Sequence, residues 1–355
     1  MKIFDGKYTL RPFRDKDESG VLNLWTTAFK SNMPPEIFRW KYLENPYEQA
    51  MMLCVTDEEE VVTFYGGIPY LFQYENKVVP AVHLMDIMSH PMHRQNRIFE
   101  KTAKQFMEFF CTSENLLLMY GFPGEFHYSI GERILNYRMV TSAVYLTLCL
   151  NDAERITQPD LVNNDFDLTD GSASSLDKLS VERVALIDKE ASWFDSLWSK
   201  TKEDYPFSIV RDSKFLKWRF FNHPARQYIV LKFADSSDNS NIKTDLEAFV
   251  VLQINGSKIS IVDMLMPNSS ALFKKVISLI VKYLTHEGVK HEGIDHIETW
   301  LPEKHFLAQN ALACGFKNQK EPIGIIPTVS LFEHSPSLEW IQSNLYYNMG
   351  DGDLL

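Results

Sequence analysis

Two segments of the chain repeat almost the same order of aromatic, apolar and basic positions. Residues 38–46 read FRWKYLENP and residues 216–224 read LKWRFFNHP, so Trp40 corresponds to Trp218 without a gap. Further pairs of similar segments lie on both sides at nearly the same separation. A separation that stays almost constant over much of each half predicts two copies of one domain.

Hydrophobic spacing in the first half predicts short strands and helices. Apolar residues three or four positions apart indicate a helix at 17–29, and a helix around Trp40 begins behind Pro34 and Pro35. Strands are predicted at 8–12, 51–55, 61–65 and 78–88, the last three as an antiparallel meander. A later helix packs on the sheet through an apolar stripe formed by Phe99, Ala103, Phe106 and Phe110.

The second half repeats this layout. Strands are predicted at 228–233, 246–254 and 258–266, followed by a helix at 270–284. We expect an α+β protein with two tandem domains, each a mixed, mostly antiparallel, twisted sheet flanked by helices. The predicted division is a first domain at 1–150, a polar linker at 151–180, a second domain at 181–334 and a C-terminal tail at 335–355.

Composition narrows the class of protein. The 355 residues are 45% hydrophobic and 23% charged, which is typical of a globular protein. No apolar run is long enough to span a membrane and the start lacks a secretory signal, so we expect a cytoplasmic protein without membrane contact. The net charge of −11 disfavours nucleic acid as a partner. The four cysteines show no metal-ligand spacing, so no metal is expected, and the oligomeric state is not indicated.

Features present in both halves are better explained by a shared scaffold than by one active site. On this ground Trp40 and Trp218 are predicted to be packing anchors. Asp86 corresponds to Asp263, which favours a hydrogen-bonding role at a strand end over that of a general base. The end of the chain is expected to be a disordered acidic tail, with a reach into a cleft or to a metal as the alternative.

A basic turn at 86–99 is present in the first half alone. A strand ends, His93, Arg94 and Arg97 follow, and a helix begins. Free N–H groups at the start of a helix bind phosphate groups well, so the turn is our candidate phosphate site, with a solvated basic turn as the alternative. The corresponding turn at 266–270 contains no Arg and no Gly.

These residues give the first half a resemblance to the GNAT-type N-acetyltransferases. The family signature is Arg or Gln, two variable residues, Gly, one variable residue, and Gly or Ala, often after His-Pro. Arg94 fills the first position behind His90 and Pro91, whereas Arg97 and Phe99 stand at the two small-residue positions. Gly lets backbone amides approach a diphosphate closely, so Arg97 either grips a phosphate directly or blocks the site.

The resemblance implies two tandem GNAT-like domains, the second degenerate, and acetyl-CoA as co-substrate of the first. It implies that the strand end runs along the pantetheine arm and that the turn holds the phosphates. The implied acetyl-CoA residues are Ile87, Met88, Ser89, Arg94, Gln95, Asn96, Arg97, Ile98 and Phe99.

The resemblance also implies direct acetyl transfer assisted by a base and an acid. The acid in this family is commonly a Tyr, and that position holds Glu132, so Tyr128, one turn earlier, is the nearest candidate. Possible bases are Glu125, His127 and His83, each of which is alternatively a structural residue.

The expected function is acetyl-CoA-dependent N-acetylation of a small amine or amino sugar, or, less favoured, of a peptide amine. Two alternatives stay open. One is a GNAT scaffold that has lost turnover and acts as a ligand-binding or interaction module. The other is an aminoacyl or other acyl transferase.

Overall fold

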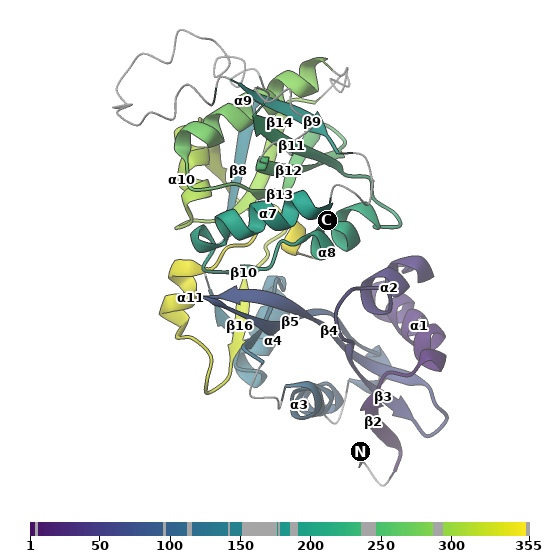
Figure 1. Ribbon diagram of the computed structural model, residues 1–355. Coiled ribbons are helices and arrows are strands. Elements are labelled where there is room, and N and C mark those ends of the chain that lie inside the picture. The colour runs from purple at the N-terminus through teal and green to yellow at the C-terminus, as the bar shows by residue number, and fades with distance from the viewer. Residues whose placement is uncertain are drawn as a thin grey trace.

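The computed structural model of the chain contains two sheets stacked one above the other, each flanked by helices (Figure 1). The α+β class and the mixed, mostly antiparallel sheets predicted from the sequence are confirmed. The described residues are 1–3, 6–94, 97–111, 116–140, 143–150, 176, 178–184, 191–235, 246–286 and 294–352. Among them, no helix is both long and apolar enough to cross a bilayer.

The first sheet has the order β1-β2-β3-β4-β5-β6-β16-β7, with β10 paired to β4. Its strands are β1 (Lys2–Ile3), β2 (Tyr8–Pro12), β3 (Ala50–Thr56), β4 (Val61–Tyr74), β5 (Lys77–Ser89), β6 (Leu118–Gly121), β7 (Arg138–Met139), β10 (Phe207–Ile209) and β16 (Thr328–Leu331). Its helices are α1 (Glu18–Phe29), α2 (Pro35–Tyr42), α3 (Ile98–Phe110) and α4 (Glu125–Ile134). The predicted antiparallel meander is confirmed as β3-β4-β5.

The second sheet has the order β15-β8-β14-β13-β12-β11-β9. Its strands are β8 (Ala143–Cys149), β9 (Leu179–Arg183), β11 (Ile229–Asp235), β12 (Leu246–Asn255), β13 (Lys258–Leu265), β14 (His296–Pro302) and β15 (Lys317–Gln319). Its helices are α7 (Ala191–Thr201), α8 (Ser213–Leu216), α9 (Ser270–His286) and α10 (Phe306–Ala313). A π-helical turn, η7 (Lys217–Phe221), continues α8, while α11 (Leu338–Asn344) and the 3-10 turn η8 (Met349–Asp351) end the described chain.

The strand pairings cross the domain boundaries that the sequence predicted. β8 lies before residue 150 but pairs with β14 and β15 of the second sheet. β10 and β16 lie beyond residue 181 but pair with β4 and β6 of the first sheet. Figure 1 shows the exchange, with blue β8 among green strands and yellow β16 beside blue ones. Hydrophobic spacing predicts that a segment is a strand, but not which sheet it joins.

The two tryptophans of the repeat meet between the halves. Their rings stack at 4.9 Å with an interplanar angle of 17°. Trp40 Nε1 donates to the carbonyl of Trp218 at 3.0 Å, and Trp218 Nε1 donates to the carbonyl of Trp40 at 2.9 Å. Both residues are buried, so the predicted packing role is confirmed. The duplicated sequence thus forms a near-symmetric contact that joins its own two copies.

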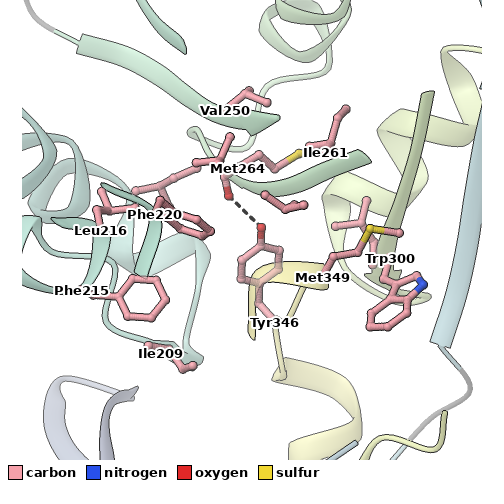
Figure 2. Close-up of a cluster of buried hydrophobic side chains, with 14 of the residues drawn as sticks. Ile209, Phe215, Leu216, Phe220, Val250, Ile261, Met264, Trp300, Tyr346 and Met349 are labelled. Carbon is pink, nitrogen blue, oxygen red and sulfur yellow. Dashed lines mark hydrogen bonds between the residues drawn. The ribbon is translucent and has the colours of Figure 1, made fainter. Parts of the chain in front are cut away.

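The expectation of a disordered acidic tail is wrong for residues 335–352. Asp351 is buried and accepts a hydrogen bond from Arg211 Nη2 at 2.6 Å. The hydroxyl of Tyr346 donates to the carbonyl of Met264 at 2.7 Å, within the apolar cluster of Figure 2. A partner about 140 residues upstream neutralises the acidic residue, and spacing along the sequence does not reveal such a pairing. Asp353 lies outside the described residues.

Candidate functional site

The candidate site begins where the parallel strands β5 and β6 separate. They pair only at Val82 with Met119 and at His83 with Tyr120. Just beyond this point β5 contains a β-bulge, because its residues 86 and 87 both lie opposite one residue of β4. Asp86, the first bulge residue, has a left-handed φ of 54°.

The separation opens a cavity of about 580 Å³, whose walls come from α1, β5, β6, the turn before α4, α4 itself and β16. Successive strand residues point to opposite faces of a sheet. Met85 and Tyr120 belong to the core cluster that contains α1, whereas Ile87 and Tyr137 pack in the cluster that contains α3. Since all four line the cavity, it reaches both faces of the first sheet.

Asp86 contributes a buried carboxylate to the cavity wall. It accepts hydrogen bonds from Lys41 Nζ and from the Tyr42 hydroxyl, both at 2.9 Å. The side chains of Asp86 and Lys41 are each only 6% exposed. The hydrogen-bonding role predicted for Asp86 is therefore confirmed.

His83 and Tyr120 form a second polar group on the α1 face of the cavity. Their rings are stacked at 4.7 Å with an interplanar angle of 11°. Burial raises the pKa of Tyr120 well above its ordinary value, so the phenol stays neutral. Its hydroxyl has no hydrogen-bond partner among the described residues. His83 was a candidate from the sequence, whereas Tyr120 was not. The available signal for Tyr120 was its place directly before the strand end at Gly121-Phe122-Pro123.

The predicted acid and base residues on α4 lie in different environments. His127 lines the cavity, and burial lowers the pKa of its imidazole, so it is neutral near pH 7. Glu125 is exposed at the start of the helix. The hydroxyl of Tyr128 donates to Glu132 Oε1 at 3.0 Å, and its partly buried ring packs against the cluster that contains α3 without lining the cavity. The structure thus brings His127 to the cavity but not Glu125 or Tyr128, and the catalytic roles of all three stay predictions.

The basic turn precedes α3, whose N-terminus has no side-chain cap. Arg97 occupies the N-cap position with a left-handed φ of 56°, the conformation that the Gly of the family signature adopts readily. Its Nε donates to Glu100 Oε2 at 2.6 Å. Arg94 is exposed, and Gln95 and Asn96 lie outside the described residues.

The other implied acetyl-CoA residues follow β5 into α3. Ile87 lines the cavity. Met88 and Ile98 are buried, and the Ser89 hydroxyl is buried without a partner among the described residues. The Phe99 ring lies 6.3 Å from that of His127. Strand β5 therefore runs from the cavity to the basic turn. Binding of acetyl-CoA by these residues stays a prediction.

In the second half, the strands equivalent to β5 and β6 are β13 and β14, and a C-terminal segment of the chain fills the space where they separate. β13 and β14 pair in parallel only from Lys258 to Ser260, and η8 then packs against both strands. Asp263, the counterpart of Asp86, is fully buried and accepts from Arg211 Nε at 2.9 Å and from Asn348 Nδ2. A Cβ added to Gly350 would lie 2.7 Å from the carbonyl oxygen of Val262, so the segment fits tightly.

Comparisons with known proteins bear on the family and on the fold. Residues 9–134 match the family of acetyltransferase (GNAT) domains. In a search of curated proteins, no match was found. The match lies within the first half of the chain and identifies this part as a GNAT domain. The resemblance noted in the sequence is confirmed.

Solved structures resemble both halves of the chain. A probable N-acyltransferase of unknown function from Enterococcus faecalis is 13% identical with a TM-score of 0.65, covering 92% of this chain and 73% of its own. A GCN5-related N-acetyltransferase from Kribbella flavida is 11% identical with a TM-score of 0.59, covering 91% and 70%. The N-myristoyltransferase of Saccharomyces cerevisiae, solved with myristoyl-CoA, is 10% identical with a TM-score of 0.57, covering 93% and 83%. At these identities the likeness concerns the fold alone.

Proposed function

We propose that the protein is an acetyl-CoA-dependent N-acetyltransferase whose first half transfers the acetyl group directly to a small amine. The observation that carries the proposal is the cavity between β5 and β6, which passes through the first sheet beside the bulge at Asp86. A donor bound on the α3 face and an acceptor bound on the α1 face would meet in this opening.

In this proposal the donor's diphosphate lies at the N-terminus of α3. The uncapped N–H groups and the positive end of the helix dipole support that position, together with the exposed Arg94. The pantetheine arm then follows β5 through residues 87–89 towards the cavity. The thioester reaches the α1 face at the bulge.

The proposed reaction is attack of the amine nitrogen on the thioester carbonyl carbon. The C–N bond forms, the C–S bond breaks, and the CoA thiolate takes up a proton. His83, on the α1 face, would accept the proton of the amine. His127, whose ring lies near α3, would be the nearest imidazole to the departing sulfur.

Calorimetry with acetyl-CoA and release of free CoA on an amine panel test this proposal. We expect binding, and release of CoA with at least one primary amine. Arg94→Ala removes a charged hydrogen bond worth ~1.5–3 kcal/mol and should weaken acetyl-CoA binding accordingly. Binding without release on any amine would instead support a ligand-binding module. Absence of binding at millimolar acetyl-CoA would reject the enzyme.

A further inference from the structure

We propose that the acceptor is an apolar primary amine with an aromatic or branched alkyl body, seated against Trp25 and Phe29 on the α1 face of the cavity. This inference rests on the proposed function and names its substrate class. It departs from the amino sugar that the sequence left open.

The first observation is the aromatic wall on the α1 face. The rings of Trp25 and Phe29 contact each other at 4.6 Å, and both line the cavity. Phe29 is 46% exposed, so the cavity has a mouth at this wall. Phe122, also in the lining, lies beside His83, with ring centroids 5.7 Å apart. The aromatic body of an acceptor would bury its apolar surface against these rings and form ring–ring contacts that water cannot form.

The second observation is that three hydroxyl groups of the wall already form hydrogen bonds within the protein, whereas the phenol of Tyr120 is the one hydroxyl of the lining without a partner among the described residues. The hydroxyl of Thr328 donates to the carbonyl of Ile326 at 2.7 Å, and that of Ser330 donates to the carbonyl of Leu135 at 3.1 Å. Ser31 Oγ accepts from the indole of Trp25 at 3.3 Å. A sugar entering this cavity would lose hydrogen bonds to water and find few replacements, which costs affinity for each hydroxyl.

The third observation is the balance of charge. The carboxylate of Asp86 faces Lys41 Nζ at 2.9 Å, so the pair contributes no net charge to the cavity. A polyamine would therefore place several positive charges beside a cavity wall whose described residues offer no unpaired carboxylate to neutralise them. A single amine in apolar surroundings has a lowered pKa, and the neutral form is the nucleophile that attacks the thioester.

The position of the wall assigns it to the acceptor and not to the acyl chain. Direct transfer requires donor and acceptor to be bound together, and the donor enters from the α3 face. The α1 mouth beside Phe29 is on the opposite face of the sheet and stays accessible when the donor is bound.

The test compares 2-phenylethylamine, glucosamine and spermidine with the full chain. Titration of each amine in the presence of saturating CoA measures binding, and free-CoA release from acetyl-CoA measures turnover. We expect 2-phenylethylamine to bind at least about tenfold more tightly than the other two. Phe29→Ala should weaken its binding and raise its KM about ten- to hundredfold, with little change in the KM for acetyl-CoA.

Matched variants separate a local effect from a folding defect. Phe109→Ala removes a phenyl ring that is 57% exposed on α3, away from the cavity, and should change neither constant. Phe29→Leu keeps an apolar side chain and should restore most of the binding.

Three results would overturn the inference. One is turnover of glucosamine or spermidine with a lower KM than that of 2-phenylethylamine. Another is unchanged amine binding in Phe29→Ala. The third is a Phe29→Ala effect confined to octanoyl-CoA, which would assign the wall to an acyl chain. Failure of the proposed function differs from all three, because acetyl-CoA would then neither bind nor release CoA, while Phe29-dependent binding of 2-phenylethylamine would persist.

Discussion

A single backbone angle connects the family signature to this chain. The signature has Gly where Arg97 stands, and the φ of 56° shows that the position requires the left-handed conformation. The sequence revealed the departure from the signature but not its cost, because a dihedral angle cannot be read from residue types. The guanidinium of Arg97 binds Glu100, so it points along α3.

Replacing Arg97 tests whether its left-handed backbone conformation strains the fold. Arg97→Gly should stabilise the fold by about 0.5 kcal/mol, because relief of the left-handed strain exceeds the entropy that Gly adds to the unfolded chain. Arg94, three residues earlier, has an ordinary φ of −67°, so Arg94→Gly should destabilise the fold by about 0.5–1 kcal/mol. Urea unfolding measures both. A loss of stability in Arg97→Gly equal to that in Arg94→Gly would contradict the assigned strain.

The helix α4 shows how closely one element is fitted to the cavity wall. A Cβ added to Gly131 would lie 2.1 Å from the ring of Tyr137, a residue that lines the cavity. At Gly124, just before the helix, an added Cβ meets nothing within 4 Å. The two glycines are therefore a matched pair for testing the packing of this element.

Gly131→Ala should destabilise the protein by about 1–3 kcal/mol, because the Tyr137 ring must move to make room. It should also weaken acetyl-CoA binding if the donor uses the cavity. Gly124→Ala, at a φ of −71°, should be nearly neutral. Chemical denaturation and calorimetry on both variants measure these effects. Equal stability of the two variants would argue against the close packing.

At the element scale, hydrophobic spacing predicted much of the first sheet. The antiparallel meander, the apolar stripe of α3 and the helix around Trp40 are present as expected. The cavity was not predictable in the same way. It depends on a bulge at Asp86 and on β16, which comes from far along the chain to pair with β6. Local periodicity does not encode either feature.

The two halves form one interlocked molecule. Exchanged strands, the stacked tryptophans and the segment 345–352 tie each sheet to the other. The sequence predicted the duplication and the asymmetry of the basic turn. It could not predict that the second separation of strands is closed by the C-terminal segment, because Arg211, Asp263 and Asp351 are brought together only by folding.

This buried cluster should make stability depend on pH. Burial raises the pKa of Asp263 to about 6, and the Asp351 carboxylate beside it acts in the same direction. The neighbouring Arg211 lowers this pKa but does not outweigh the two effects. Because the folded state then binds more protons than the unfolded state, this group contributes stability at low pH that is lost as pH rises from about 4 to about 6. Asp263→Asn should remove that component of the pH dependence. Urea unfolding from pH 4 to pH 8 measures it, and identical slopes in the variant and the parent would contradict the assignment.

The central claim is that acyl transfer takes place in the opening between β5 and β6 of the first half. The most direct measurement is free-CoA release from acetyl-CoA with a panel of primary amines. Ile87→Arg places a long charged side chain into the cavity, and Ile323→Arg places the same side chain on the surface, where Ile323 is 52% exposed. We predict release by the parent and by Ile323→Arg, and loss of release in a folded Ile87→Arg. Release by Ile87→Arg at the parent rate, or no release by the parent with any amine, would contradict the claim.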